Sequence, residues 1–185
     1  MASNMTQDKI IEAFKKLLEG QSFSTIKVTA IVTTAGVSHM SFYRKYADKY
    51  ALLEEICYDD FVSFAKIYGR NATWKEVCVC LFNCVKNNRQ FYRKIFVDDH
   101  ALEVAVQAAG RVSSDFTGGT ISEYTGAIWK IVLRNWARNN MAESVGSVVQ
   151  TLLEHLPISD VMNEQERRNY LGRYEGTTMQ EFPRR

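Results

Sequence analysis

One stretch decides the fold of this chain: Ala35-Gly36-Val37-Ser38-His39-Met40-Ser41-Phe42-Tyr43-Arg44-Lys45-Tyr46. Gly36 has no Cβ atom and therefore permits the positive φ that a tight turn between two helices requires. Ser38 is a good N-cap for a helix that follows the turn. Phe42 and Tyr46 are four residues apart and can face a core together, which leaves polar and basic side chains toward solvent. This pattern is typical of a helix-turn-helix whose second helix enters the DNA major groove.

The flanking residues predict further short helices packed around this turn. Apolar side chains recur at helical spacing over residues 9–18, and Gly20 follows as a stop signal. Residues 28–35 predict the helix that precedes the turn. Asp48 is a plausible cap for a fourth helix that begins after it. The sequence therefore predicts a small helical unit at the N-terminus.

The segment from Ile10 to Leu53 resembles the DNA-binding domain of the TetR family of transcriptional regulators. The matching residues are Ala13-Phe14, Leu17-Leu18, Phe23, Ile26-x-Val28-x-x-Ile31, Ala35-Gly36-Val37-Ser38, Phe42-Tyr43-Arg44-x-Tyr46 and Lys49-Tyr50-x-Leu52-Leu53. One departure is Lys27, where the family usually has a Thr or Ser that caps the second helix; capping falls to Thr25 or is lost. The resemblance implies an all-α fold, with a DNA-binding domain over residues 1–54 and a helical regulatory and dimerisation domain over residues 55–185.

The resemblance also implies DNA contacts for ten side chains. We expect His39, Met40 and Ser41 at the base-reading start of the recognition helix, Tyr43 and Lys49 on phosphates, Arg44 and Lys45 on bases or backbone, and Lys27, Thr29 and Ser38 close by. The alternative at each position is a solvated surface residue. The formal net charge of +2 neither requires nor excludes nucleic-acid binding.

Beyond residue 57 the resemblance thins to helical patterns. Thr73 and Glu76 fit a capping box at the start of an apolar helix. A later helix is expected to end at Gly110, before a loop over residues 112–119 that is rich in Ser, Thr and Gly. Two long helices are predicted over residues 121–139 and 144–156. A short helix over residues 163–171 completes the prediction.

The resemblance implies a small-molecule pocket and a dimer interface in this C-terminal region. The pocket candidates are its aromatic side chains, Phe64, Tyr68, Phe82, Phe96, Tyr124 and Trp129. The interface candidates come from the two long helices, Ile128, Val132, Val148, Val149 and Leu152. The alternative for every one of these residues is the ordinary core of a single chain.

No catalytic, metal or membrane signature stands out. Cys78, Cys80 and Cys84, with Cys57, are expected to be reduced thiols packed as small apolar side chains, because no Cys/His pair has zinc-site spacing. We expect no metal and no cofactor, and we find no nucleophile-and-base signature, so the chain is predicted not to be an enzyme. No stretch reaches the roughly 18 consecutive apolar residues of a membrane span, and the N-terminus has no apolar signal core, which predicts a cytoplasmic protein without a membrane partner.

The sequence as a whole predicts a dimeric transcriptional regulator. Its partners would be double-stranded operator DNA of near-palindromic sequence, a second copy of the chain and an unknown small-molecule effector. A ligand-responsive repressor is the favoured form of this prediction. Two alternatives are an enzyme on a helical scaffold and a protein-interaction module that retains the helix-turn-helix as packing only.

Overall fold

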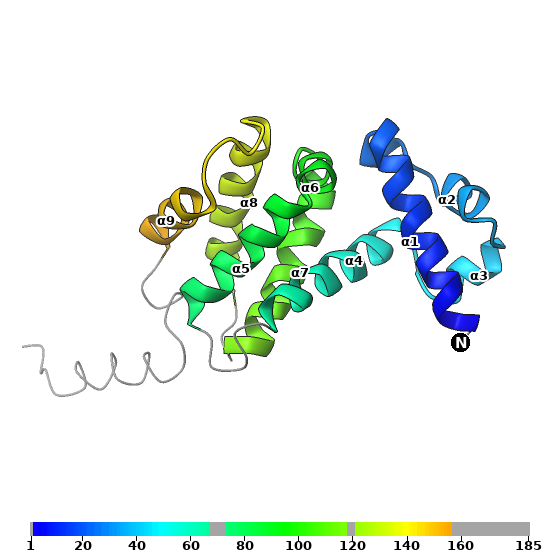
Figure 1. Ribbon diagram of the computed structural model, residues 1–185, viewed down its shortest axis with the longest axis horizontal. Helices are drawn as coiled ribbons and strands as arrows, with labels where there is room; N and C mark the ends of the chain where they lie inside the picture. The colour runs from blue at the N-terminus through cyan, green and yellow to red at the C-terminus, as the bar shows by residue number, and fades with distance from the viewer. Residues whose placement is uncertain (1, 67–72, 118–120, 157–185) are drawn as a thin grey trace, which may run out of the picture.

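The computed structural model describes residues 2–66, 73–117 and 121–156, and the regular secondary structure in these parts is entirely helical (Figure 1). The elements are α1 (Ala2–Gly20), the 3₁₀ turn η1 (Phe23–Thr25), α2 (Val28–Ala35), α3 (His39–Tyr43), α4 (Lys49–Ala65), α5 (Trp74–Asn87), α6 (Arg89–Phe96), α7 (Asp99–Thr117), α8 (Glu123–Arg138) and α9 (Val145–His155). The predicted all-α fold is confirmed. The predicted helix over residues 163–171 lies outside the described residues.

The helices form two lobes that α4 connects. Figure 1 shows α1, α2 and α3 together at one end and α5 to α9 at the other. The predicted domain boundary after residue 54 falls inside α4, which is one continuous helix and packs along α7. A single hydrophobic cluster includes buried residues from both lobes. The N-terminal lobe is therefore held against the C-terminal lobe by a shared core.

Local signals around the helix-turn-helix behave as the sequence predicts. Gly36 follows α2 in the left-handed region with φ of 65°. Ser38 caps α3, since its hydroxyl oxygen accepts a hydrogen bond from the backbone N–H of Ser41 at 3.1 Å. Phe42 and Tyr46 are buried with 0% and 2% exposure, although α3 itself ends at Tyr43. The short helix α3 is thus anchored by two aromatic side chains, one of which lies beyond its last turn.

The second helix lacks a side-chain cap. Lys27 occupies the N-cap position of α2 and makes no capping hydrogen bond. The Thr25 hydroxyl donates instead to the carbonyl oxygen of Ser22 at 2.9 Å, within η1. The sequence left two outcomes open, a cap from Thr25 or no cap, and the structure shows that α2 has no side-chain cap.

The helix starts predicted in the rest of the chain are well formed. The Asp48 carboxylate accepts hydrogen bonds from the N–H groups of Tyr50 and Ala51 at 2.8 and 2.9 Å, at the start of α4. Thr73 and Glu76 form the expected capping box of α5. These interactions satisfy N–H groups that a helix start would otherwise leave unpaired.

One predicted helix end is wrong. The sequence predicted a stop at Gly110 and a loop over residues 112–119, but α7 continues to Thr117. Val112 and Ser113 are 0% and 1% exposed. Gly110 also lies beneath Ile121, whose Cδ1 atom would be 3.6 Å from an added Cβ atom. Burial of this turn of the helix outweighs the roughly 1 kcal/mol that a glycine costs within a helix.

Candidate nucleic-acid interface

Helix α3 presents its predicted reading side chains to solvent. Met40 and Tyr43 are 80% and 54% exposed, and His39 and Arg44 are exposed as well. The rings of His39 and Tyr43 stack with centroids 6.3 Å apart. Tyr43 also meets the buried ring of Phe42 edge-on at 5.5 Å, which connects the exposed aromatic pair to the lobe's core. The exposed edge therefore offers an apolar group, two aromatic rings and a guanidinium.

Ser38 and Ser41 have a different role in this structure. Besides the capping bond, their two hydroxyl oxygens lie 2.9 Å apart. The pair therefore stabilises the first turn of α3. Contact of either hydroxyl with DNA stays a prediction.

Lys45 is held by a hydrogen-bonded network that joins α1 to α4. Its ammonium donates to Gln7 Oε1 at 2.8 Å, and the amide nitrogen of Gln7 donates to the Glu55 carboxylate. The Tyr46 hydroxyl donates to the same carboxylate at 3.0 Å. Burial, followed by this hydrogen bond, raises the pKa of Tyr46 far above its ordinary value of 10.0, so the phenol stays protonated. The network fixes the segment after α3 relative to both neighbouring helices.

Lys49 is the most constrained of the predicted phosphate-binding residues. Its Nζ atom donates to the carbonyl oxygens of Phe23, Ser24 and Ile26 at 2.8, 3.1 and 3.0 Å. The same atom lies 4.5 Å from the centroid of the Phe23 ring. Burial lowers the pKa of Lys49, against the attraction of Asp98 and Asp48. An ammonium has three N–H donors, so these carbonyls already use all of them. The phosphate role stays a prediction, and the structure adds a role in holding η1 on the start of α4.

A shallow groove on α2 brings together threonine hydroxyl groups, most of which were not among the predicted DNA contacts. A pocket of about 450 Å³ is lined by Thr25, Lys27, Thr29, Ala30, Thr33 and Thr34. Lys27 and Thr29 were predicted, whereas Thr33 and Thr34 were not. The signal was available, because Thr29 and Thr33 are four residues apart and therefore share one face of the helix. Threonine hydroxyls and a lysine ammonium are groups that commonly bind DNA phosphates.

The predicted ligand pocket is not assembled from its candidates. Phe82, Phe96 and Trp129 are 1%, 0% and 2% exposed and belong to the core. Phe82 and Trp129 contact each other with ring centroids 5.6 Å apart. Tyr124, on α8, is 62% exposed, and a side chain with this much exposure does not line an enclosed pocket either.

Neither described pocket contains any of these candidates. Phe64 is half-buried against the core, and Tyr68 lies outside the described residues. Phe82, Phe96 and Trp129 fill the core and Tyr124 faces solvent, and their role in a ligand pocket stays a prediction.

The residues predicted for the dimer interface are buried on α9 and half-buried on α8, and their role in a dimer stays a prediction. Val148, Val149 and Leu152 are at most 3% exposed, because they pack into the core of the single chain. Ile128 and Val132 are half-buried. The large exposed apolar side chains of α8 are Tyr124 and Ile131, at 62% and 61%.

No helix among the described residues is long and apolar enough to cross a membrane. The same part of the chain holds no group of three or more His, Cys, Asp or Glu side chains arranged for a metal ion. All four cysteines are buried thiols that form no disulfide, and burial raises the pKa of the Cys84 thiol to about 12. They pack as apolar side chains.

Comparisons with known proteins agree with the helix-turn-helix. Residues 10–56 match the family described as bacterial regulatory proteins, tetR family. The HTH-type dhaKLM operon transcriptional activator DhaS of Lactococcus lactis subsp. lactis (strain IL1403) is 31% identical over 101 residues, which are 55% of this chain and 54% of that protein. The chain therefore spans about half the length of this curated relative.

One solved structure shares the fold, and a second is less similar. A TetR transcriptional regulator from Streptococcus agalactiae 2603V has a TM-score of 0.60 at 21% identity, over 83% of this chain and 94% of that one. A dihydroxyacetone kinase operon activator DhaS has a TM-score of 0.44 at 20% identity, over 80% and 92%. The matched family is one of regulatory proteins, which agrees with the prediction that the chain is not an enzyme. Residues 10–56, which contain the helix-turn-helix, are therefore those of the tetR family of bacterial regulatory proteins.

Proposed function

We propose that this protein regulates transcription by binding double-stranded DNA through α2 and α3. The observation that carries the proposal is the exposed edge of α3, where Met40, Tyr43 and Arg44 face solvent from a helix that Phe42 anchors. A guanidinium can bind the two acceptors of guanine together, and a Met side chain can contact a thymine methyl group. A phenol hydroxyl suits a phosphate oxygen. These contacts together would read a short base sequence and fix the helix in the groove.

The groove on α2 supplies the second set of proposed contacts. Thr29 and Thr33 offer hydroxyl donors, and Lys27 offers a charge that no capping bond uses. Contacts of this kind bind the phosphate backbone without reading bases. We therefore assign α2 to positioning and α3 to sequence recognition.

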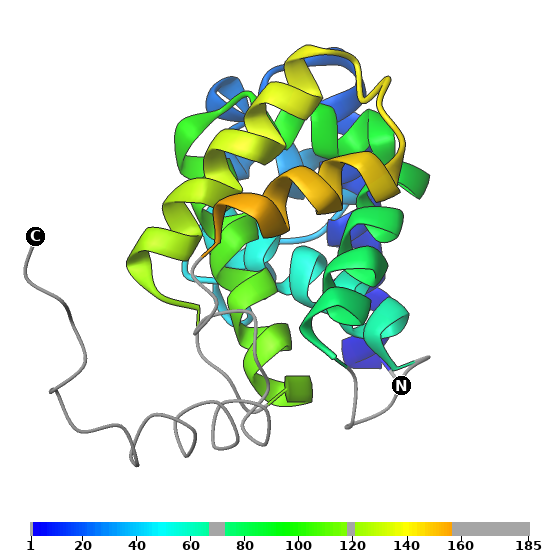
Figure 2. The same ribbon diagram turned by 90° about the vertical axis from the view of Figure 1, so that its left-hand side faces the viewer.

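We propose that two copies bind together. A dimer can place two recognition helices in successive major grooves, about 34 Å apart, which favours a near-palindromic operator. Tyr124, Ile128 and Ile131 follow one another at spacings of four and three on α8 and so share a face. Figure 2 shows α8 and α9 crossing on the side of the molecule that lies away from α1 to α3. A partner on this side would leave the α2 and α3 surfaces free for DNA.

Ligand-responsive repression remains the proposed outcome of binding, and activation is the competing one. The Lactococcus relative is named a transcriptional activator. Both outcomes begin with operator binding in the cytoplasm, and they differ in whether RNA polymerase is excluded or recruited. Transcription in vitro from a promoter that carries the selected operator separates them, because repression lowers and activation raises the yield of transcript.

Selection of bound DNA from a random double-stranded pool tests the proposal. We expect enrichment of a near-palindromic sequence by the full chain. Tyr43→Ala with Arg44→Ala should weaken binding to that sequence by about a hundredfold, if each lost contact is worth roughly 1.4 kcal/mol. Lys75→Ala, which changes an exposed residue on α5, is the matched control and should bind as the unmodified protein does. Absence of enrichment would refute DNA binding and favour the protein-interaction module.

A further inference from the structure

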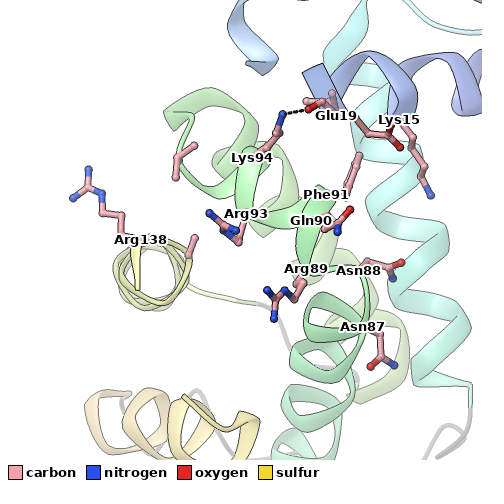
Figure 3. Close-up of a pocket in the computed structure, with 13 residues that line it drawn as sticks. Lys15, Glu19, Asn87, Asn88, Arg89, Gln90, Phe91, Arg93, Lys94 and Arg138 are labelled. Atoms are coloured by element: carbon pink, nitrogen blue, oxygen red, sulfur yellow. Dashed lines mark hydrogen bonds between the residues drawn. The ribbon is translucent and has the colours of Figure 1, made fainter. Parts of the chain in front are cut away.

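A cationic pocket lies where α1, α6 and the end of α8 meet (Figure 3). Its volume is about 940 Å³, which is enough for a small-molecule ligand. Five cationic side chains line it, namely Lys15, Arg89, Arg93, Lys94 and Arg138, against a single carboxylate from Glu19. The whole chain carries a net charge of only +2. Positive charge is therefore concentrated here well beyond the average of the molecule.

The arginines of this pocket are available to a ligand. Arg89 and Arg93 are exposed, and Figure 3 shows their guanidinium groups on the same side of α6. No ion pair formed within residues 2–66, 73–117 and 121–156 includes Arg89, Arg93 or Arg138. Arginine suits oxyanions because its planar fork can donate two parallel hydrogen bonds to a phosphate or a carboxylate.

The arrangement on α6 is unfavourable without an anion. Arg89 and Arg93 are four residues apart, and like charges at this spacing repel each other along a helix. Arg89 is also the first residue of α6, where the helix dipole disfavours a cation. No side chain caps this helix start. A bound oxyanion would relieve the repulsion between the arginines and the conflict with the helix dipole.

We propose that this pocket binds a small multivalent oxyanion, bearing phosphate groups or paired carboxylates, and that it is the effector site of the regulator. The assignment as an effector site rests on the proposed function, whereas the binding itself does not. The site differs from the aromatic pocket expected from the sequence, since none of those aromatic residues lines it. It contains residues from both lobes of the chain.

The position of the pocket gives a direct route to the DNA-binding lobe. Lys94 donates from Nζ to the carbonyl oxygen of Glu19 at 2.6 Å, at the end of α1. Lys15 lies with its Nζ atom 5.6 Å from the centroid of the Phe91 ring on α6. An anion between α6 and α8 would compete with Glu19 for Lys94 and attract Arg89 and Arg93. Ligand binding would thereby change the contact that holds α1 against α6.

Calorimetric titration of the full chain tests the binding. The probes are sodium pyrophosphate and sodium citrate at constant ionic strength, which separate phosphate from carboxylate ligands. We expect saturable binding of at least one probe at one site per chain. Arg89→Gln with Arg93→Gln should weaken it by about a hundredfold, since a charge-assisted hydrogen bond contributes roughly a factor of ten or more. Lys16→Gln with Lys75→Gln removes the same charge from exposed positions outside the pocket and should change the affinity less than twofold.

Two further measurements locate the site and separate it from DNA binding. Tyr43→Ala with Arg44→Ala should leave anion affinity unchanged, which excludes binding of the probe at the DNA-binding surface. The probe that binds should shift operator affinity in the unmodified protein and not in the Arg89→Gln, Arg93→Gln variant. Failure of both probes to bind, or equal loss in the control variant, would overturn the anion site even if DNA binds. Anion binding without any DNA selection would instead overturn the proposed function and leave the site standing.

Discussion

Lys49→Met separates the two roles of Lys49, which are to stabilise the fold through η1 and to bind a DNA phosphate. The substitution retains most of the aliphatic side chain and removes the ammonium that three carbonyl oxygens accept from. Two of these hydrogen bonds, to Phe23 and Ile26, are partly buried, and each bond from a charged donor contributes about 1.5–3 kcal/mol. The third, to Ser24, is exposed and adds little. Allowing for residual solvation of the freed carbonyls, we expect the free energy of unfolding to fall by about 2–4 kcal/mol.

Urea denaturation followed by circular dichroism measures this change. The midpoint should fall while the slope stays constant, because the surface exposed on unfolding is unchanged. Lys27→Met is the matched control, since Lys27 is exposed and makes no capping bond, and its effect should stay within about 0.5 kcal/mol. A loss below about 0.5 kcal/mol for Lys49→Met, within that surface-substitution range, combined with weaker DNA binding would refute the structural role and assign the lysine to phosphate alone.

Three other predictions address the turn, the partner surface and a buried carboxyl. Gly36→Ala should destabilise the protein by about 1–2 kcal/mol in the same denaturation assay, because φ is 65° although the space beside it is open; an unchanged midpoint would mean that the turn relaxes at no cost. Ile131→Glu should convert the proposed dimer to a monomer in light scattering, and an unaltered mass would place the interface elsewhere. Burial raises the pKa of Asp60 above 3.8, so its contribution to stability is complete below that pH and is lost as pH rises through the folded pKa. Asp60→Asn, which can still accept from the Tyr92 hydroxyl, should therefore gain stability relative to the unmodified protein as pH rises from about 4 to 7 in urea titrations, and a constant difference would contradict this.

The features predicted correctly from the sequence depend on residues close together in the chain. Gly36 in the left-handed region and the caps at Ser38, Asp48 and Thr73 each involve partners within about four positions. Such interactions are complete once the local backbone forms. The DNA-binding lobe contains many of these short-range features, which explains why α2 and the caps of α3 and α4 could be predicted; α1 begins at Ala2, earlier than the predicted start at residue 9.

The errors arise where burial depends on a distant partner. The apolar spacing of Val148, Val149 and Leu152 indicated a buried face but did not identify what covers it, and the covering surface belongs to the same chain. Gly110 predicts the end of a helix, but Ile121 packs against it and α7 continues to Thr117. The cationic pocket could not be predicted for the same reason, because its charges come from three helices that are distant in sequence.

The two ends of α1 carry the polar contacts that position the DNA-binding lobe. Near its start, Gln7 joins Lys45 and Glu55. At its end, Glu19 accepts from Lys94 beside the cationic pocket. A helix of 19 residues is about 28 Å long, so if α1 moved as a rigid rod, a movement at the Glu19 end would be transmitted to the segment that follows α3. In the proposed dimer both lobes would tilt together and change the separation of the two recognition helices. In this proposal operator affinity would depend on that separation, and a ligand that binds one tilt better than the other would control it by the difference between its two affinities.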